Sequence, residues 1–283
     1  MTNNYETGEL GTLIKITENE FNKLADFIKK NYGIQLKEGK QALVTSRLYY
    51  ELVSKNFKNF TQYYEYILSD RTGEAVTALI DRITTNHTFF MREAEHFYYF
   101  RDKVLPYLSA TVKNKDLRIW SAGCSTGQEP YTLAIIINDY FKDNKKLWDT
   151  KILATDISTK VLNKAEKGIY TGEDIKPLPS IWRLNYFKKL DDGNYKAVDE
   201  IRNEVIFRKF NLMEKKYPFS KKFHTIFCRN VMIYFDDETK NELLMKFYNV
   251  LELGGYLFIG HTETIPRNIT GFQYVMPSVY RKV

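Results

Sequence analysis

Apolar residues in the first part of the chain recur at helical spacing. Phe21, Leu24 and Ile28 fall on one face of a helix, which begins at a capping box over 17–20 and ends near Gly33. The same spacing predicts further helices over 41–55, 61–67, 74–84 and 93–108. We therefore expect an all-α N-terminal part, made of a polar tail over 1–16, a helical domain over 17–75 and connecting helices over 76–110.

After residue 114 short apolar runs alternate with helical stretches. Strands are predicted over 117–122, 151–156, 223–228 and 256–260, and helices over 130–140, through 161–165 and from 236 to the glycine pair 254–255. Such alternation is typical of a doubly wound, mainly parallel sheet, which an antiparallel pair over 272–281 would complete. The fold class is therefore α/β over 111–283, and the Asp192–Gly193 turn predicts a small antiparallel β-subdomain inserted over 186–210.

The charge of the chain changes this picture little. A formal net charge of +7 and a pI near 9.0 raise the question of a nucleic-acid partner. Basic and acidic residues are interleaved, however, and residues 1–75 contain about ten of each. Without a clustered basic stripe, we expect no nucleic-acid partner.

Cysteine and histidine usage predicts neither a disulfide framework nor a metal site. Cys124 and Cys228 lie in a predicted strand end and a predicted strand, and two cysteines are too few for a framework. The four histidines share no metal-ligand spacing: His87, His96, His224 and His261. His96 is expected on a helix surface and His224 in a strand. We therefore expect no metal.

The N-terminal residues predict neither export nor membrane insertion. Residues 1–11 are polar and include Glu6 and Glu9, unlike a signal peptide. No apolar run approaches the ~20 residues that span a bilayer. We therefore expect a cytoplasmic protein without direct membrane insertion.

The candidate chemistry lies at the strand ends, because open parallel sheets bind ligands beyond the carboxyl ends of their strands. Small residues over 121–130 let the backbone approach a ligand, and Glu129 can bind a cation such as a ligand ammonium. The loop lacks the full dinucleotide fingerprint and the Walker lysine. Asp156 ends the next strand, at the position that accepts ribose hydroxyls. Alone, the loop can be an ordinary turn and Asp156 a helix cap; together they favour a nucleoside ligand.

A third strand end carries Arg229, Asn230 and then Tyr234, a combination that packing alone does not explain. Methyltransferases that act on planar amino groups often have an Asn-Pro-Pro-Tyr motif at this place. Val231 and Met232 replace its prolines here. This difference argues against a base or an amide as the methyl acceptor.

Several segments, in order along the chain, resemble the chemoreceptor glutamate methyltransferases of the CheR family. They are 84–93, 121–131, 154–157, 211–212 and 226–236, and 260–263 is similar to a late motif of the family. The resemblance runs from about Thr17 to the C-terminus. It implies an all-α N-terminal domain, then a seven-stranded methyltransferase sheet with an inserted β-subdomain. It also implies transfer of a methyl group from S-adenosylmethionine to glutamate side chains of bacterial chemoreceptors, leaving S-adenosylhomocysteine.

The resemblance implies roles for the matching positions. The cofactor-binding candidates are Asn86, Thr88, Arg92, Gly123, Glu129, Asp156, Asn211, Leu212, Arg229 and Asn230. Gly123 and Glu129 would line the methionyl pocket, and Asp156 would hold the ribose. Asn211 and Leu212 would contact the adenine. The candidate catalytic residues are Arg92, near the methionine end of the cofactor, and Tyr234, facing the acceptor.

The implied partners are the cytoplasmic helices of transmembrane chemoreceptors, with recruitment to receptor arrays and a monomeric enzyme. Three departures from the family pattern bear on this expectation. Met91 replaces a phenylalanine, a conservative change. Tyr49 and Tyr50 stand where many members have arginines, which puts docking by that face in doubt. The 191–194 loop is too short for the loop that binds a receptor's C-terminal pentapeptide tether, so we expect tether-independent recognition.

The residues present suit esterification of a carboxylate. An ionised glutamate is already nucleophilic at neutral pH, so the reaction needs no general base. Alignment of the reactants and exclusion of water should supply most of the rate. Two alternatives stay open: a methyltransferase that acts on RNA or a small molecule, and a signalling module that binds S-adenosylmethionine without catalysis. The sequence does not identify the receptor or the modified glutamates.

Overall fold

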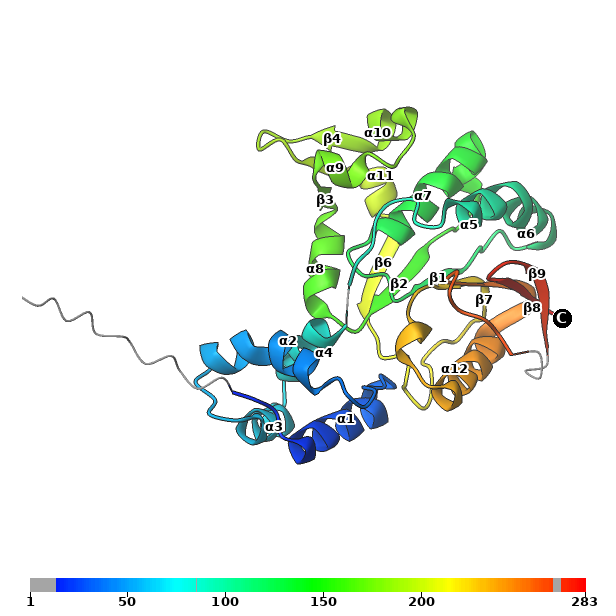
Figure 1. The fold of residues 1–283 in the computed structure, drawn as a ribbon. Helices are drawn as coiled ribbons and strands as arrows, with labels where there is room; N and C mark the ends of the chain where they lie inside the picture. Colours follow the sequence, from blue (N-terminus) through cyan, green and yellow to red (C-terminus); the bar gives the residue numbers. More distant parts are fainter. Residues whose placement is uncertain (1–13, 85, 267–270) are drawn as a thin grey trace, which may run out of the picture. The chain divides into compact units, whose positions relative to one another are not determined.

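The computed structural model describes residues 14–84, 86–266 and 271–283, which form two compact units (Figure 1). The first unit runs to Lys30 and continues over 36–84, and the second takes in 31–35 and the rest of the chain. The predicted polar tail lies outside the described residues except for 14–16, of which Ile16 is buried. No helix within the described ranges has both the length and the apolar character needed to cross a membrane.

The first unit is all-helical, as predicted. Its helices are α1 (Glu18–Tyr32), whose last two residues are counted with the second unit, α2 (Gln41–Ser54), α3 (Phe60–Ser69) and α4 (Glu74–Ile83). The capping box is present: the backbone N–H of Thr17 donates to Glu20 at 2.9 Å, and that of Glu20 donates to Oγ1 of Thr17 at 3.3 Å. The unit extends to Thr84, beyond the predicted domain end at residue 75, because α4 buries its apolar face, including Leu79 and Ile80.

The second unit contains the predicted doubly wound sheet. In the described residues it has seven strands in the order β6-β2-β1-β7-β8-β10-β9. Their bounds are β1 (Ile119–Ala122), β2 (Ile152–Asp156), β6 (Val205–Lys209), β7 (Phe223–Cys228), β8 (Leu251–Ile259), β9 (Phe272–Met276) and β10 (Val279–Lys282). Pairing is parallel from β6 to β8, and β10 is antiparallel to both of its neighbours. β1 and β7 are buried at every residue, as expected for central parallel strands covered on both faces.

Helices cover both faces of this sheet. α7 (Gln128–Phe141) and α12 (Asp237–Val250) lie on opposite sides of it (Figure 1). Trp120 of β1 contacts Phe247 of α12, and Tyr131 of α7 contacts Phe207 of β6. α8 (Thr159–Lys167) follows β2. Right-handed crossovers in opposite directions from β1 place these helices on the two faces.

The predicted helix over 93–108 is interrupted by a π-helical segment. It consists of α5 (Ala94–Tyr99), a π-helix η1 (Phe100–Val104) and α6 (Leu105–Thr111). Pro106 stands in the first turn of α6. Because proline has no N–H to continue an α-helical ladder, a change of helical type at this point is expected.

The predicted limits of the β-subdomain are wrong at both ends. The small antiparallel sheet has the order β3-β5-β4, with β3 (Ile169–Tyr170), β4 (Phe187–Lys189) and β5 (Tyr195–Ala197). Between them lie α9 (Gly172–Ile175) and α10 (Ser180–Tyr186), and α11 (Asp199–Arg202) follows. β6 belongs to the main sheet, where it pairs in parallel with β2. Val205 and Phe207 of β6 are buried in the core. Burial of these two side chains favours pairing of β6 with β2 over pairing within the small sheet.

The glycine pair at 254–255 was predicted to end a helix, but it lies inside β8. α12 ends at Val250 and β8 begins at once. Gly254 has a φ of +77°, and a Cβ on Gly255 would lie 2.9 Å from the carbonyl oxygen of His224. The register of β7 against β8 shifts at this point. The glycines therefore allow an irregular, close pairing of two strands.

Candidate active site

The order of the strands reverses at β1, which has β2 on one side and β7 on the other. Chains that leave neighbouring strands here turn to opposite faces, so a crevice opens beyond their carboxyl ends. The three segments singled out in the sequence follow β1, β2 and β7 directly. The fold thus brings them to one edge of the sheet.

The loop after β1 has a left-handed backbone at three positions. Gly123, Ser125 and Gly127 have φ of +88°, +48° and +93°. A Cβ on Gly127 would lie 2.9 Å from both Cβ of Ala165 and the hydroxyl of Tyr170, so only glycine fits between this turn and α8. Ser125 adopts a conformation that costs a non-glycine residue about 1–3 kcal/mol, and such strain concentrates at functional sites.

Asp156 holds this loop in place. Its Oδ2 accepts the N–H of Ser125 at 2.8 Å, and its Oδ1 accepts that of Ser158, the N-cap of α8, at 3.0 Å. Oγ of Ser125 donates to the carbonyl of Asn86 at 3.1 Å. One carboxylate therefore connects the ends of β1 and β2, and through Ser125 the segment that begins at Asn86.

Arg229 lies buried between two carboxylates. Its side chain is 3% exposed, Nη1 lies 3.1 Å from Glu129 and Nη2 lies 3.0 Å from Glu93. Nη2 also donates to the carbonyl of Arg92, and the guanidinium covers the ring of Phe97 at 5.1 Å. Burial of a charge is costly unless it is paired, so these contacts offset the cost of burying the Arg229 side chain.

The carboxylates outnumber the cations at this edge. Glu93, Glu129 and Asp156 contribute −3 and Arg92 and Arg229 contribute +2, a net of −1 before the carboxyl group of Glu263 is counted. Oγ of Ser121 also donates to Glu129 at 2.7 Å. Burial by itself would raise the pKa of Glu93, but the charge of Arg229 and hydrogen bonds from Asn230 and His261 lower it overall, so Glu93 is ionised. The site therefore favours a cationic ligand.

A further carboxylate, that of Glu263, shapes the loop after β7. Glu263 is 6% exposed and accepts the N–H groups of Asn230 at 3.0 Å, Ile233 at 3.1 Å and Gly260. Burial raises its pKa, although these backbone bonds oppose the change. Asn230 has a left-handed φ of +59°, and its side chain donates to Glu93 at 3.1 Å. Glu263 thus holds the strained turn that carries Arg229 and Asn230.

Glu263→Gln should lower the free energy of unfolding by about 1–2 kcal/mol. The amide keeps the size of the side chain, but turns an NH₂ group toward backbone N–H donors. Urea unfolding of the purified protein measures the loss. Glu173→Gln is the matched control, because the Glu173 side chain is 84% exposed and its ion pair with Lys176 stabilises little. Equal stability of both variants would contradict a structural role for Glu263.

The other predicted residues differ in how they join this network. Nη1 of Arg92 donates to the carbonyl of His87 at 2.7 Å, in the segment that also contains Thr88. Tyr234 lies in a 3-10 turn, η3 (Met232–Tyr234), after β7, and its carbonyl accepts the N–H of Gln35 at 2.8 Å.

Asn211 and Leu212 follow β6, the strand beside β2. Their hydrogen bonds go to residues outside the Arg229 network. Nδ2 of Asn211 donates to the carbonyl of Asn31 at 2.8 Å, and the carbonyl of Leu212 accepts the hydroxyl of Tyr217 at 2.8 Å. Among the hydrogen bonds of the described residues, none joins these two to the Arg229 network. Their place at the end of β6, next to Asp156, still puts them on the ligand edge of the sheet.

Sequence reasoning missed the partners of the predicted residues. Glu93 and Glu263 are the last residues of the segments 84–93 and 260–263, and no role was predicted from the sequence for either side chain. The signal that was available is the buried arginine at a strand end, which requires acidic partners. The prediction for His96 was wrong: it is fully buried rather than on a helix surface.

Two family descriptions together match nearly the whole chain. "CheR methyltransferase, all-alpha domain" matches residues 19–84, and "CheR methyltransferase, SAM binding domain" matches residues 86–280. The chain is 45% identical to a chemotaxis protein methyltransferase of Borreliella burgdorferi, over 95% of this chain and 96% of the relative. It is 35% identical to a chemotaxis protein methyltransferase of Escherichia coli (93% and 92%), and 32% identical to chemotaxis protein methyltransferase 2 of Vibrio cholerae (90% and 88%).

Proposed function

The chain belongs to the CheR family of S-adenosylmethionine-dependent chemotaxis methyltransferases, and we propose that it esterifies specific glutamate side chains of bacterial chemoreceptors. The observation that carries this proposal is the network of Glu129, Arg229 and Glu93 at the sheet's switch point. Its net negative charge, with Asp156 beside it, suits a cationic nucleoside.

The residues at this edge fit S-adenosylmethionine. Gly123 and Glu129 would receive the methionyl part, with the Glu129 carboxylate near its ammonium group. Asp156 would accept the ribose hydroxyls, and Asn211 and Leu212 would contact the adenine. Asn86, Thr88 and Arg92 would lie over the cofactor, and Arg229 and Asn230 would form the floor near the reacting methyl group. When bound, the cofactor supplies an electrophilic methyl group on a sulfonium.

The acceptor side needs positioning more than acid–base chemistry. A glutamate carboxylate is ionised at neutral pH and attacks as it is. We propose that the Arg92 guanidinium and the Tyr234 hydroxyl hold it in line with the methyl group. Cys124 and Cys228 do not supply a nucleophile, because burial raises the pKa of both thiols well above its usual range.

Tyr234→Phe should lower the rate of methyl transfer on the order of 10-fold, as expected for one lost hydrogen bond to a charged group. Affinity for S-adenosylmethionine should stay within about 2-fold, because the hydroxyl is proposed to face the acceptor. Single-turnover methylation and cofactor titration separate the two effects. Tyr274→Phe, at an exposed residue of β9, is the control. Equal rates for both variants would make Tyr234 a structural residue only.

We further propose a cytoplasmic monomer that is recruited to receptor arrays through the receptors' cytoplasmic helices, without nucleic acid. The 73% exposure of Tyr50, where many members have arginine, favours a docking face less basic than usual. The β4–β5 turn is closed by a bond from the N–H of Leu190 to the carbonyl of Asn194 at 2.7 Å. Such a tight turn supports recognition without a C-terminal pentapeptide tether.

Labelled methyl transfer tests the reaction directly. The protein is incubated with methyl-labelled S-adenosylmethionine and receptor-containing membranes, and the labelled receptor is then treated with alkali. Label released as methanol would establish a carboxyl methyl ester. Receptors that lack their last five residues should be labelled equally well. Cofactor binding without transfer to receptor would overturn the proposed acceptor and leave the cofactor site standing.

A further inference from the structure

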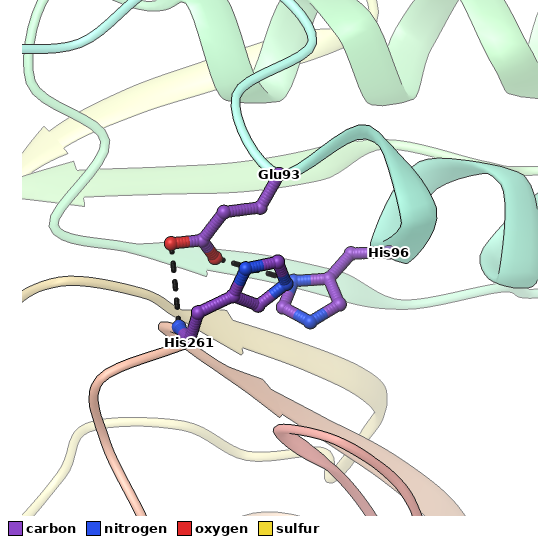
Figure 2. A group of neighbouring side chains, drawn as sticks. All are labelled: Glu93, His96 and His261. Atoms are coloured by element: carbon purple, nitrogen blue, oxygen red, sulfur yellow. Dashed lines mark hydrogen bonds and ion pairs between the residues drawn. The ribbon is translucent and has the colours of Figure 1, made fainter.

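Three potential metal ligands from two distant parts of the chain converge (Figure 2), and one of them, Glu93, also pairs with Arg229. Glu93 directly precedes α5, His96 is the third residue of that helix, and His261 comes from the loop after β8. One ligand atom from each of the three lies within 4.8 Å of the others. From the sequence no metal is expected, because the four histidines share no metal-ligand spacing.

His96 is the least satisfied of the three. It is fully buried, and neither ring nitrogen has a hydrogen bond of normal geometry within the described protein. The Pro277 carbonyl favours an N–H on this ring and is a candidate outer partner, as metal-bound histidines usually have. An unpaired buried polar group is costly, and an occupant of this site would relieve that cost.

The spacing of the ligand atoms suits a tetrahedral ion. Zn²⁺ bonds of about 2.0–2.2 Å place two ligands of a tetrahedral site about 3.3–3.5 Å apart. Nδ1 of His96 already lies 3.5 Å from Oε2 of Glu93. The three ligand atoms all lie within 4.8 Å of one another, and the His261 side chain is exposed and therefore able to close the remaining distance. Its ring lies 4.8 Å from that of His96, centroid to centroid, and perpendicular to it.

We propose that Glu93, His96 and His261 form a binding site for one divalent transition-metal ion of the Zn²⁺ class, and that the bound ion inhibits methyl transfer. Two imidazoles and one carboxylate are a zinc ligand set that leaves a fourth position for water. The ion enters from the solvent side through His261. The inhibitory part rests on the proposed function, whereas binding of the ion does not.

Inhibition follows from competition for one oxygen. Oε2 of Glu93, which faces His96, is also the atom that pairs with Nη2 of Arg229 at 3.0 Å. An ion at this position displaces the guanidinium, and its charge of +2 makes the local net charge more positive by two units. A cationic sulfonium is then repelled. By reciprocity, S-adenosylmethionine weakens Zn²⁺ binding by the same factor as Zn²⁺ weakens cofactor binding.

Zn²⁺ titration against a chromophoric chelator tests the site without any activity. Wild-type protein should take up one Zn²⁺ per chain, and His261→Ala should bind at least 10-fold more weakly. His87→Ala is the matched control, because His87 is also exposed but lies outside the cluster, and it should bind like wild type. Co²⁺ in place of Zn²⁺ should give visible absorption bands that His261→Ala loses. Equal Zn²⁺ affinity of wild type and His261→Ala would overturn the site.

The inhibitory effect has its own test. S-adenosylmethionine should weaken Zn²⁺ binding more than S-adenosylhomocysteine does, since only the donor carries a sulfonium charge. Zn²⁺ should also inhibit methylation by the wild type and by His87→Ala at the same concentration, with recovery on adding EDTA. Equal effects of donor and product on Zn²⁺ affinity would overturn inhibition by charge, and full activity with the site loaded would overturn inhibition altogether. Absence of methylation without Zn²⁺ would instead count against the proposed function, leaving the Zn²⁺ titration valid.

Discussion

Arg229→Ala is expected to lower the free energy of unfolding by about 3–5 kcal/mol and to abolish methyl transfer. Removal of one partner from a buried ion-pair network leaves the others desolvated and unpaired, which costs this much. In this chain the guanidinium separates two carboxylates, Glu93 and Glu129, which would then repel each other. It also bonds the Arg92 carbonyl and covers Phe97, so packing is lost as well.

Urea unfolding followed by circular dichroism measures this loss of stability. Arg101→Ala is the matched control: its side chain is 42% exposed and pairs with the adjacent Asp102, so the change should cost about 0–1 kcal/mol. Arg229→Lys should fall between the two, because an ammonium keeps the charge without the bidentate geometry. An Arg229→Ala protein as stable as Arg101→Ala would show that the network stabilises nothing.

Asp156→Ala is expected to weaken binding of S-adenosylmethionine by about 1–3 kcal/mol. Two effects contribute, the lost acceptors for the ribose hydroxyls and the loss of order in the loop that Asp156 holds through the N–H of Ser125 at 2.8 Å. Asp156→Asn separates them in part. Its amide keeps one oxygen able to accept a backbone N–H, so it should retain more affinity than the alanine variant.

Calorimetric titration with S-adenosylmethionine tests this expectation. Asp149→Ala is the control, since Asp149 is exposed at the opposite end of the same region, just before β2. It should bind with wild-type affinity. Unchanged affinity in Asp156→Ala would remove the ribose assignment. Equal losses in the alanine and asparagine variants would assign the effect to the charge of Asp156.

Most of the fold was predictable because it rests on periodicity. The spacing of Phe21, Leu24 and Ile28 predicted α1, and continuous apolar runs predicted the buried strands β1 and β7. The errors fall where local pattern is ambiguous. Val205–Lys209 alternates like a hairpin strand, but its partner is β2, about fifty residues earlier. Gly254 and Gly255 are a usual helix stop, but here they lie within β8.

The candidate site, too, was predictable in part. Its position was predictable, because strand ends follow from the pattern, and an open parallel sheet exposes those ends at one edge. The pairing within it was not. Glu93 and Arg229 are separated by 136 residues, and Asn230 and Glu263 by 33. The roles proposed for Arg92, Asp156 and Tyr234 remain predictions that the variants above test.

The sequence by itself determined the helical first unit, the doubly wound sheet and the segments that reach its ligand edge, because side-chain periodicity and strand-end chemistry are local properties. Only the tertiary structure decided which charges meet. It placed Arg229 between Glu93 and Glu129, set Glu263 under the turn at Asn230, and buried His96 beside His261. The physical reason is that the cost of burying a charge or a polar nitrogen depends on its partners in space. Those partners come from strands and loops that only the fold brings together.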